Sequence, residues 1–317
     1  MTLFKNTGNK DTRSGFGVGL MEAAKKNENI VALCADLIGS LKMDDFVKTY
    51  PERFIQTGIA EANMMVVAAG LTIGGKIPFA GTFAEFASGR VYDQVRQSIA
   101  YSNKNVKIAA SHAGLTLGED GATHQTMEDI GLMKGLPHMV VINPADFNQT
   151  KAATIAAAEY DGPVYLRFGR PKVPNFTPEN MPFEIGKAWT LKEGKDVTIF
   201  ATGHLLWTAL EAVEILAKKN IDVELINIHT IKPLDKKAVL ASAAKTKAVV
   251  SAEEHLMNGG LGDSIAQLLM QNNPVPMEYV AVDDKFGESG TADQLLEKYG
   301  LGVNDIVKAV ENVLKRK

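Results

Sequence analysis

The segment GEDGATHQT, residues 118–126, sets two carboxylates between two glycines, with an imidazole three residues further on. Side chains of these types can transfer protons, bind a cation or hydrogen-bond a polar substrate. The segment lacks the oxygen-ligand spacing of a calcium loop, and none of the six histidines are four residues apart, as in a zinc-binding helix. Taken alone, the segment is better explained as a polar turn before a helix, with Thr126 and Asp129 as a capping pair. The loop alone leaves a helix start and a catalytic role open.

Three nearby segments carry further groups that could do chemistry. His112 ends the apolar run before the loop, GIAEANM (58–64) carries Glu61, and TFAEFASGR (82–90) carries Phe83 and Phe86. These segments occupy similar positions within one alternating strand–helix region. Because open α/β sheets place ligands at the carboxyl ends of parallel strands, we expect these side chains to share a site.

Short runs rich in β-branched residues alternate with helical patterns along the first half of the chain. The expected strands are 29–36, 77–81, 105–114, 139–146 and 163–169, and the expected helices are 13–27, 61–75, 89–103 and 147–160. Continuous apolar strands between helices predict a parallel sheet covered on both faces. The alternating glycines of GFGVGL (15–20) lie inside a helical pattern, so we attribute them to close packing rather than to dinucleotide binding.

Four prolines between residues 171 and 182 predict an extended linker, because proline fixes φ and removes a hydrogen-bond donor. The alternation then restarts, with expected strands 196–203, 221–231, 247–255 and 277–284 and expected helices 205–220, 236–245, 262–271, 292–300 and 304–317. The predicted fold class is α/β, with two consecutive domains, each a mainly parallel sheet flanked by helices. We place the first domain at residues 1–178, a linker at 179–189 and the second domain at 190–317.

The composition argues against several classes of protein. The chain has 317 residues, 45% of them hydrophobic, and a net charge of −3, which is unlike a polybasic nucleic-acid-binding protein. No apolar run reaches the roughly 18–20 residues that span a bilayer, and the N-terminus has no apolar signal core. The single cysteine, Cys34, lies in an apolar run, where a buried inert thiol is expected. These features predict a soluble cytoplasmic protein that binds neither nucleic acid nor membrane.

Seven motifs in a fixed order resemble the C-terminal half of a transketolase, the pyrimidine-binding domain followed by the C-terminal domain. They are DTR (11–13), ADLIGS (35–40), QTGIAEANMMVVAAGL (56–71), GTFAEF (81–86), SHAGLTLGEDGATHQT (111–126), RFGRP (167–171) and EEHLMNGGLG (253–262). The chain resembles this half over essentially its whole length, as in transketolases encoded as two separate subunits. The resemblance implies a transferase of the pentose phosphate pathway type. With thiamine diphosphate as cofactor, such an enzyme moves a two-carbon ketol unit from a ketose phosphate to an aldose phosphate.

The resemblance assigns three residues to the pyrimidine of thiamine diphosphate. Glu61 would hydrogen-bond the ring nitrogen as a catalytic residue, since burial favours the protonated, donating form of a carboxyl. Phe83 and Phe86 would form an aromatic wall, a contact worth about 1 kcal/mol beyond simple burial. Many single-chain transketolases carry a third aromatic where this chain has Gly89. The wall must then be completed differently, with Tyr92 as a candidate.

The resemblance also implies an anionic substrate. Four residues match the phosphate-contact positions of the family: Arg13, Ser40, His112 and Arg170. An arginine fork with hydroxyl and imidazole donors suits a phosphate, and the spacing of RFGR leaves Arg167 as an alternative to Arg170.

Two residues of the opening loop match sugar-reading positions of the family. Asp120 matches a substrate-binding carboxylate that selects the configuration of a hydroxyl. His124 matches a catalytic histidine that transfers a proton or stabilises an oxyanion near the reacting carbonyl. We interpret Glu119 beside them, and His255 in EEHLMNGGLG, as structural or interfacial residues.

The diphosphate and metal site of this family, a GDG motif followed by an asparagine, has no match in the sequence. The resemblance therefore implies a partner subunit, similar to the N-terminal half of a transketolase, that binds the diphosphate and a Mg²⁺ or Ca²⁺ ion. We expect no metal ligands in this chain and a self-dimer of it within a two-plus-two heterotetramer. Alternatives are a 2-oxo-acid dehydrogenase β-subunit, a deoxyxylulose-phosphate-synthase-like half, and a regulatory subunit with a degenerate site.

Overall fold

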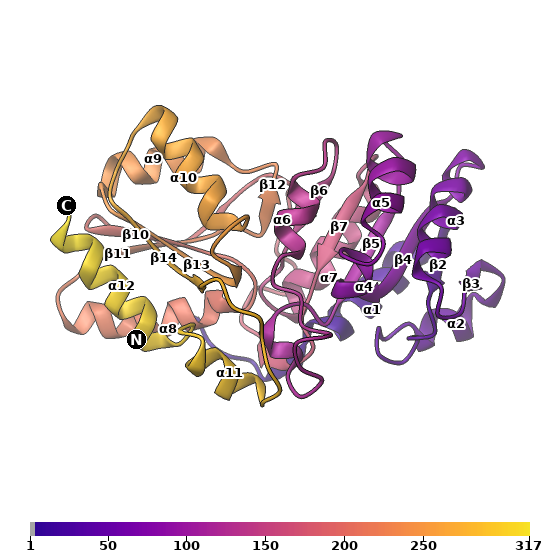
Figure 1. Cartoon of the computed structure of the whole chain (residues 1–317), viewed down its shortest axis with the longest axis horizontal. Coiled ribbons are helices and arrows are strands. Elements are labelled where there is room, and N and C mark those ends of the chain that lie inside the picture. Colours follow the sequence, from indigo (N-terminus) through magenta and orange to yellow (C-terminus); the bar gives the residue numbers. More distant parts are fainter. Residues whose placement is uncertain (1–3) are drawn as a thin grey trace.

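The structure, a computed structural model, describes residues 4–317. Two α/β units lie next to each other along the long axis of the molecule, and each has a mainly parallel sheet flanked by helices (Figure 1). The predicted fold class is therefore confirmed. Within residues 4–317, no helix is both long enough and apolar enough to cross a membrane.

The larger sheet has the strand order β12-β6-β7-β5-β4-β2-β3, and only β12 runs antiparallel to its neighbour. Its strands are β2 (Ile30–Cys34), β3 (Phe54–Gln56), β4 (Ile77–Phe83), β5 (Lys107–Ser111), β6 (Val140–Ile142), β7 (Val164–Arg167) and β12 (Thr230–Lys232). Every residue of β2, β5, β6 and β7 is buried. This agrees with the continuous apolar runs from which the strands were predicted.

Helices cover both faces of the larger sheet and form two separate apolar clusters with it. One face carries α1 (Thr12–Lys26) and α7 (Phe147–Glu159). The other carries α3 (Glu61–Ile73), α4 (Ala84–Ala87), α5 (Tyr92–Gln94) and the π-helical segment Val95–Tyr101. Shorter helices are α2 (Asp44–Thr49) and α6 (Asp129–Lys134), with 3₁₀ turns at Pro51–Arg53 and Leu115–Leu117.

The glycines of α1 allow it to pack closely on α7. A Cβ atom at Gly15 would overlap the carbonyl oxygen of Phe147, and one at Gly19 would lie 2.7 Å from Cβ of Thr154. These distances are shorter than van der Waals contact, so any residue larger than glycine at either position would push the two helices apart. The prediction that GFGVGL serves close packing is confirmed.

The smaller sheet has the order β14-β13-β10-β11-β9, parallel except for the edge strand β9. Its strands are β9 (Trp189–Lys192), β10 (Val197–Ala201), β11 (Val223–Asn227), β13 (Val249–Leu256) and β14 (Met277–Val282). Its helices are α8 (Leu205–Lys218), α9 (Lys236–Thr246), α10 (Leu261–Asn272), α11 (Ala292–Lys298) and α12 (Val303–Lys315). α8 and α12 bury apolar side chains against one face of this sheet.

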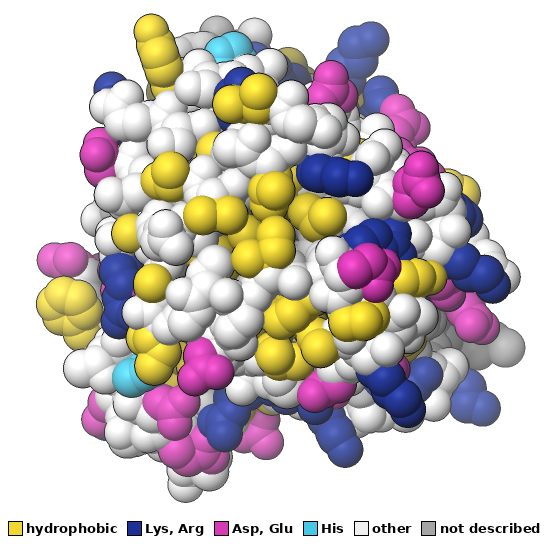
Figure 2. Space-filling view, turned by 90° about the vertical axis from the view of Figure 1, so that its right-hand side faces the viewer, with side chains coloured by type: hydrophobic (Ala, Val, Ile, Leu, Met, Phe, Trp, Pro, Cys, Tyr) yellow, Lys and Arg dark blue, Asp and Glu magenta, His cyan; other side chains and the backbone are white. Residues whose placement is uncertain are grey.

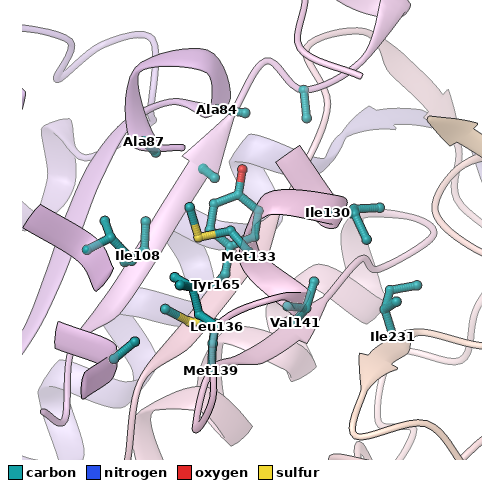
Figure 3. Packing of buried hydrophobic residues seen from close by; sticks show 14 of the residues in the cluster. Ala84, Ala87, Ile108, Ile130, Met133, Leu136, Met139, Val141, Tyr165 and Ile231 are labelled. Atoms are coloured by element: carbon teal, nitrogen blue, oxygen red, sulfur yellow. The ribbon is translucent and has the colours of Figure 1, made fainter. Parts of the chain in front are cut away.

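The two units share a sheet edge and part of a core. Residues 221–231, expected as one strand, form β11 in the smaller sheet and then β12, which pairs with β6 of the larger one. Ile231 of β12 accordingly packs near Ile130 and Val141 in one apolar cluster (Figure 3). The predicted boundaries at residues 178 and 190 stay predictions, and the larger sheet takes a strand from beyond both.

The proline-rich segment is more ordered than the predicted linker. Its first part forms β8 (Lys172–Pro174), which pairs antiparallel with β1 (Asn9–Asp11). The backbone N–H groups of Phe176 and Thr177 then donate to the carboxylate of Asp146 at 2.8 and 2.7 Å. The same carboxylate caps α7. A short ribbon and one buried acid therefore fix the chain where an extended linker was expected.

Candidate active site

The predicted site residues gather at the carboxyl edge of the larger sheet. Phe83 is the last residue of β4, His112 directly follows β5, and Arg170 lies three residues after β7. Glu61 is the first residue of α3, the helix that follows β3. Parallel strands deliver all these side chains to one edge, as expected for a ligand site in an open α/β sheet.

A buried acid and two aromatic rings form one side of the site. The rings of Phe83 and Phe86 lie 5.9 Å apart, centroid to centroid, at an interplanar angle of 20°. Glu61 is buried, and its Oε1 accepts a hydrogen bond from Nη1 of Arg90 at 3.1 Å. The guanidinium carbon of Arg90 lies 3.7 Å from the centroid of the Phe86 ring. A cation over a ring face is a favourable arrangement, so Arg90 joins the acid to the wall.

Beside Gly89 a cation contacts the ring of Phe86, and the role of Tyr92 in the wall stays a prediction. Tyr92, the candidate for the missing aromatic, begins α5 and packs against the apolar cluster of that sheet face. The cation that covers Phe86 is Arg90. Arg90 ends the segment TFAEFASGR, but it received no role from the sequence, although its place directly after the atypical Gly89 could have drawn attention to it.

His112 continues the aromatic side toward the predicted substrate residues. Its ring stacks on Phe83 with centroids 3.9 Å apart, and its Nδ1 lies 2.6 Å from Oγ of Ser111. The backbone of His112 has φ of +60°, an uncommon conformation for a residue other than glycine that often marks functional sites. Burial, with further repulsion from Arg13 and Arg170, lowers the pKa of His112 to about 3. The imidazole is therefore neutral at physiological pH.

Two arginines add positive charge on this side. Nη1 of Arg13 donates to the carbonyl oxygen of Ser40 at 3.2 Å, which joins two of the predicted phosphate contacts. Nη1 of Arg170 donates to the carbonyl oxygen of Leu117 at 2.7 Å and to the carboxylate of Glu119 at 2.6 Å. Both arginines influence the pKa of His112. The charges of both arginines therefore reach His112, which disfavours a second positive charge on its ring.

The side chain of Arg167 is buried and paired with Asp129. Its Nε donates to Oδ2 of Asp129 at 2.8 Å, and Oδ2 also accepts from the hydroxyl of Tyr165 at 2.9 Å. Arg167 is buried, so of the two candidate arginines Arg170 is the accessible one, and its contact with a phosphate stays a prediction. The same contacts correct the expected capping pair: α6 starts at Asp129 itself, and that carboxylate serves Arg167 rather than a helix cap with Thr126.

The loop of the GEDGATHQT motif closes on itself beside the aromatic wall. The N–H of Gly114 donates to the carbonyl oxygen of Thr126 at 2.9 Å, so the two ends of the loop meet. The ring of His124 lies edge-on to Phe86, 5.4 Å between centroids. Asp120 is exposed at the turn of the loop, and within residues 4–317 no hydrogen bond or ion pair joins it to another predicted site residue.

His255, interpreted from the sequence as structural or interfacial, is buried between two elements. Nδ1 of His255 lies 2.7 Å from the carbonyl oxygen of Leu256, and its Nε2 accepts from the N–H of Gly131 at 3.3 Å. Burial lowers the pKa of His255 to about 4, so a neutral ring links β13 to α6. In the part of the chain that the structure describes, no three His, Cys, Asp or Glu side chains are arranged to hold a metal ion.

Comparisons with known proteins place these features. Residues 9–175 match the family "Transketolase, pyrimidine binding domain" and residues 186–306 match "Transketolase, C-terminal domain". The 6-deoxy-6-sulfo-D-fructose transketolase subunit SqwH of Clostridium sp. (strain MSTE9) is 48% identical, over 94% of this chain and 92% of its own length. An apulose-4-phosphate transketolase subunit of Phocaeicola vulgatus is 34% identical, over 96% of this chain and 97% of its own.

A solved structure agrees with this assignment. It is a split gene transketolase, described as an inactive beta4 tetramer, with 49% sequence identity and a TM-score of 0.91. The match covers 96% of this chain and 98% of that one, so the two have the same extent. With both domains matched in order, the chain belongs to the transketolase family, as the C-terminal subunit of a split, thiamine-diphosphate-dependent enzyme.

Proposed function

We propose that this chain works in the cytoplasm with an N-terminal-half partner subunit, transferring a two-carbon ketol unit from a ketose phosphate to an aldose phosphate. The observation that supports this best is the grouping of Glu61, the Phe83–Phe86 wall and His124 at one sheet edge. Core packing alone has no need for a buried acid, a cation and an imidazole around two aromatic rings.

The residues present fit the pyrimidine half of thiamine diphosphate. When bound, this cofactor stabilises a carbanion next to its thiazolium ring. Glu61 would hold the pyrimidine ring nitrogen, with Phe83 and Phe86 facing the ring. Because Arg90 now donates to Oε1 of Glu61, binding requires that carboxyl to share or release this contact. We assign the diphosphate and a Mg²⁺ or Ca²⁺ ion mainly to the partner subunit.

The substrate side suits an anionic sugar. Arg13 and Arg170 supply fixed positive charge, and Ser40 and the neutral His112 supply uncharged donors for a phosphate. Asp120 would accept a hydrogen bond from a sugar hydroxyl. His124, beside Phe86, would move a proton near the reacting carbonyl.

The names of two relatives widen the range of sugars to test. One is named for 6-deoxy-6-sulfo-D-fructose and the other for apulose 4-phosphate. Both names describe a ketose with a sulfonate or phosphate group, and arginine forks bind either group. We propose an anionic ketose as the donor, with the sugars of the pentose phosphate pathway as one possibility within that class.

An apolar face supports assembly around a dimer of this chain. Figure 2 shows apolar side chains gathered on the side of the molecule where α3 lies in Figure 1. Ile59, Val66 and Ile73, on or just before α3, are 79%, 46% and 78% exposed. Exposed apolar patches mark interaction sites. We propose that a second copy covers this face, giving a two-plus-two heterotetramer with the partner subunit.

The direct test is to purify the chain with its partner subunit and assay ketol transfer across a panel of anionic ketoses. Glu61→Gln should lower the rate at least about 100-fold, because it keeps the shape and removes the acid. Glu52→Gln, on an exposed turn, is the matched control. Normal turnover by Glu61→Gln would refute the role of Glu61. Full activity of the chain without its partner would refute the split site, and turnover of pyruvate would favour the alternative enzyme classes.

A further inference from the structure

We propose that the second unit takes part in sugar recognition: Glu254, on β13, is a positioning residue for the loop that carries Asp120 and His124. The inference rests on the proposed function, since it concerns the same sugar site. Glu254 acts through the loop backbone, and nothing in the motif that contains it, EEHLMNGGLG, pointed to this role.

Glu254 reaches from the second unit to the base of the loop. Its Oε1 accepts a hydrogen bond from the backbone N–H of Thr116 at 2.6 Å, and its Oε2 lies 3.0 Å from Nε2 of His204. Burial acts to raise the pKa of this carboxyl, but His204, Arg167 and the N–H of Thr116 outweigh burial and lower it. The carboxylate is therefore charged, and a charged acceptor binds an N–H group more strongly than a neutral one.

The backbone of Gly114 makes room for this carboxylate. Its φ is +82°, and a Cβ atom there would lie 2.6 Å from Oε2 of Glu254. Gly114 also donates its N–H to Thr126 at 2.9 Å. Glu254 therefore lies where the two ends of the loop meet. Because it contacts the start of the loop, a displacement there would shift the loop residues that follow, including Asp120 and His124.

A second segment of the same unit, residues 287–290, supports the other side of the loop. Nε2 of Gln125 lies 3.0 Å from the carbonyl oxygens of both Leu115 and Glu288. A Cβ atom at Gly121 would lie 2.6 Å from Oγ of Ser289, so the two backbones approach closely. The second unit thus holds the loop at two places.

Sugar reading needs this support, because Asp120 lies at the exposed turn of the loop. A displacement of about 1 Å in a positioning group can cost about 100-fold in rate. Without the carboxylate of Glu254, the N–H of Thr116 loses its partner and the loop gains freedom. The sugar should then bind more weakly, and the enzyme should discriminate less between sugars that differ in the configuration of one hydroxyl group. Thiamine diphosphate, contacted by Glu61 and the aromatic wall, should bind as before.

The test compares Glu254→Ala with Glu253→Ala in the full chain assembled with its partner subunit. Glu253 is the adjacent residue of β13, is equally buried, and accepts from the N–H groups of Leu261 and Gly262 at 2.6 and 2.8 Å within the second unit. Both variants lose a buried carboxyl group, but Glu254 contacts the loop and Glu253 binds within the second unit. Glu254→Gln, which keeps an oxygen for Thr116, is the rescue variant.

Three measurements separate positioning from mere stability. They are kcat and KM with D-fructose 6-phosphate and its C4 epimer D-tagatose 6-phosphate, the Kd of thiamine diphosphate, and hydrogen–deuterium exchange of residues 114–126. Glu254→Ala should raise KM roughly tenfold, narrow the preference between the epimers and speed exchange of the loop. The Kd of thiamine diphosphate should stay constant, Glu254→Gln should recover most of the loss, and Glu253→Ala should lower stability alone.

Equal KM values and equal loop exchange in Glu254→Ala and Glu253→Ala would overturn the inference. If the assembled wild-type enzyme transferred no ketol unit from any sugar tested, the proposed function would fail, and loop exchange would still decide the role of Glu254. Should Glu254→Ala not fold, His204→Gln, which alters the ring facing Oε2, gives the same comparison.

Discussion

Replacing Gly114 by alanine tests the close approach between the two units. The methyl group would lie 2.6 Å from Oε2 of Glu254, whereas atoms in ordinary contact are about 3.5–4.0 Å apart. The carboxylate or the loop must therefore move by about 1 Å. Overpacking of this kind costs about 1–3 kcal/mol. The backbone conformation, φ +82° and ψ −173°, adds about 1–3 kcal/mol for a residue with a side chain. We expect a total loss of about 2–6 kcal/mol.

The matched control is Gly75→Ala. Gly75 also has a positive φ, +77°, but a Cβ atom there would have no neighbour within 4 Å. Its cost should be limited to backbone strain, about 1–2 kcal/mol. Urea unfolding followed by circular dichroism gives both free energies of unfolding on the isolated chain. The difference between the two variants combines the clash with Glu254 and any difference in backbone strain.

A double-mutant cycle makes the comparison specific. In a Glu254→Ala background the carboxylate is gone, so Gly114→Ala should cost only its backbone strain. The coupling free energy between the two positions should then be at least about 1 kcal/mol. Additive costs, or equal losses for Gly114→Ala and Gly75→Ala in the wild-type background, would show that the two units do not meet as described.

Three further predictions concern other parts of the molecule. Arg167→Met leaves the buried Asp129 without its cation and should lower the free energy of unfolding by about 3–5 kcal/mol in urea, against less than about 1 kcal/mol for the exposed pair removed in Arg316→Met. Burial lowers the pKa of His229 to about 4, whereas the unfolded chain has a histidine pKa of about 6.5. Between about pH 6.5 and pH 4, the imidazole is therefore protonated in the unfolded state and neutral in the native state. Stability should therefore fall with falling pH, and His229→Gln should reduce that slope by up to about 1.4 kcal/mol per pH unit; identical slopes would contradict it. Val66→Glu on α3 should weaken self-association in sedimentation velocity. Met270→Glu on α10, which replaces an apolar side chain that is more exposed (71% against 46%), should not.

Local patterns predicted the central strands well because their burial leaves little choice of residue. β2, β5 and β10 are buried at every position, and each lies within its predicted range. β3 was missed because only three residues pair, and none of them is fully buried. The run containing β11 and β12 was read as one strand, since nothing in its composition marks a crossing between sheets.

Site residues inside motifs could be predicted, but their partners could not. Glu61, Phe83 and His112 lie where parallel strands end, which the strand–helix alternation already implied. Arg90 and Glu254 gain their importance from contacts across 29 and 138 residues of sequence. The fold creates such contacts, and no short-range spacing encodes them. The Thr126–Asp129 pair failed for the same reason, because a distant arginine binds the aspartate more strongly than a helix end would.

The crossing strand β12 has a consequence for how the protein is made. On the ribosome, the whole of the predicted first domain emerges while β6 is still an open sheet edge, and it stays open until residue 232 has appeared. An unpaired edge invites pairing with other chains. Nascent chains on one messenger would expose this edge side by side. A protein fragment that ends at the predicted boundary, residue 178, should therefore tend to aggregate. A fragment that extends through β12 can complete its own sheet and should aggregate less.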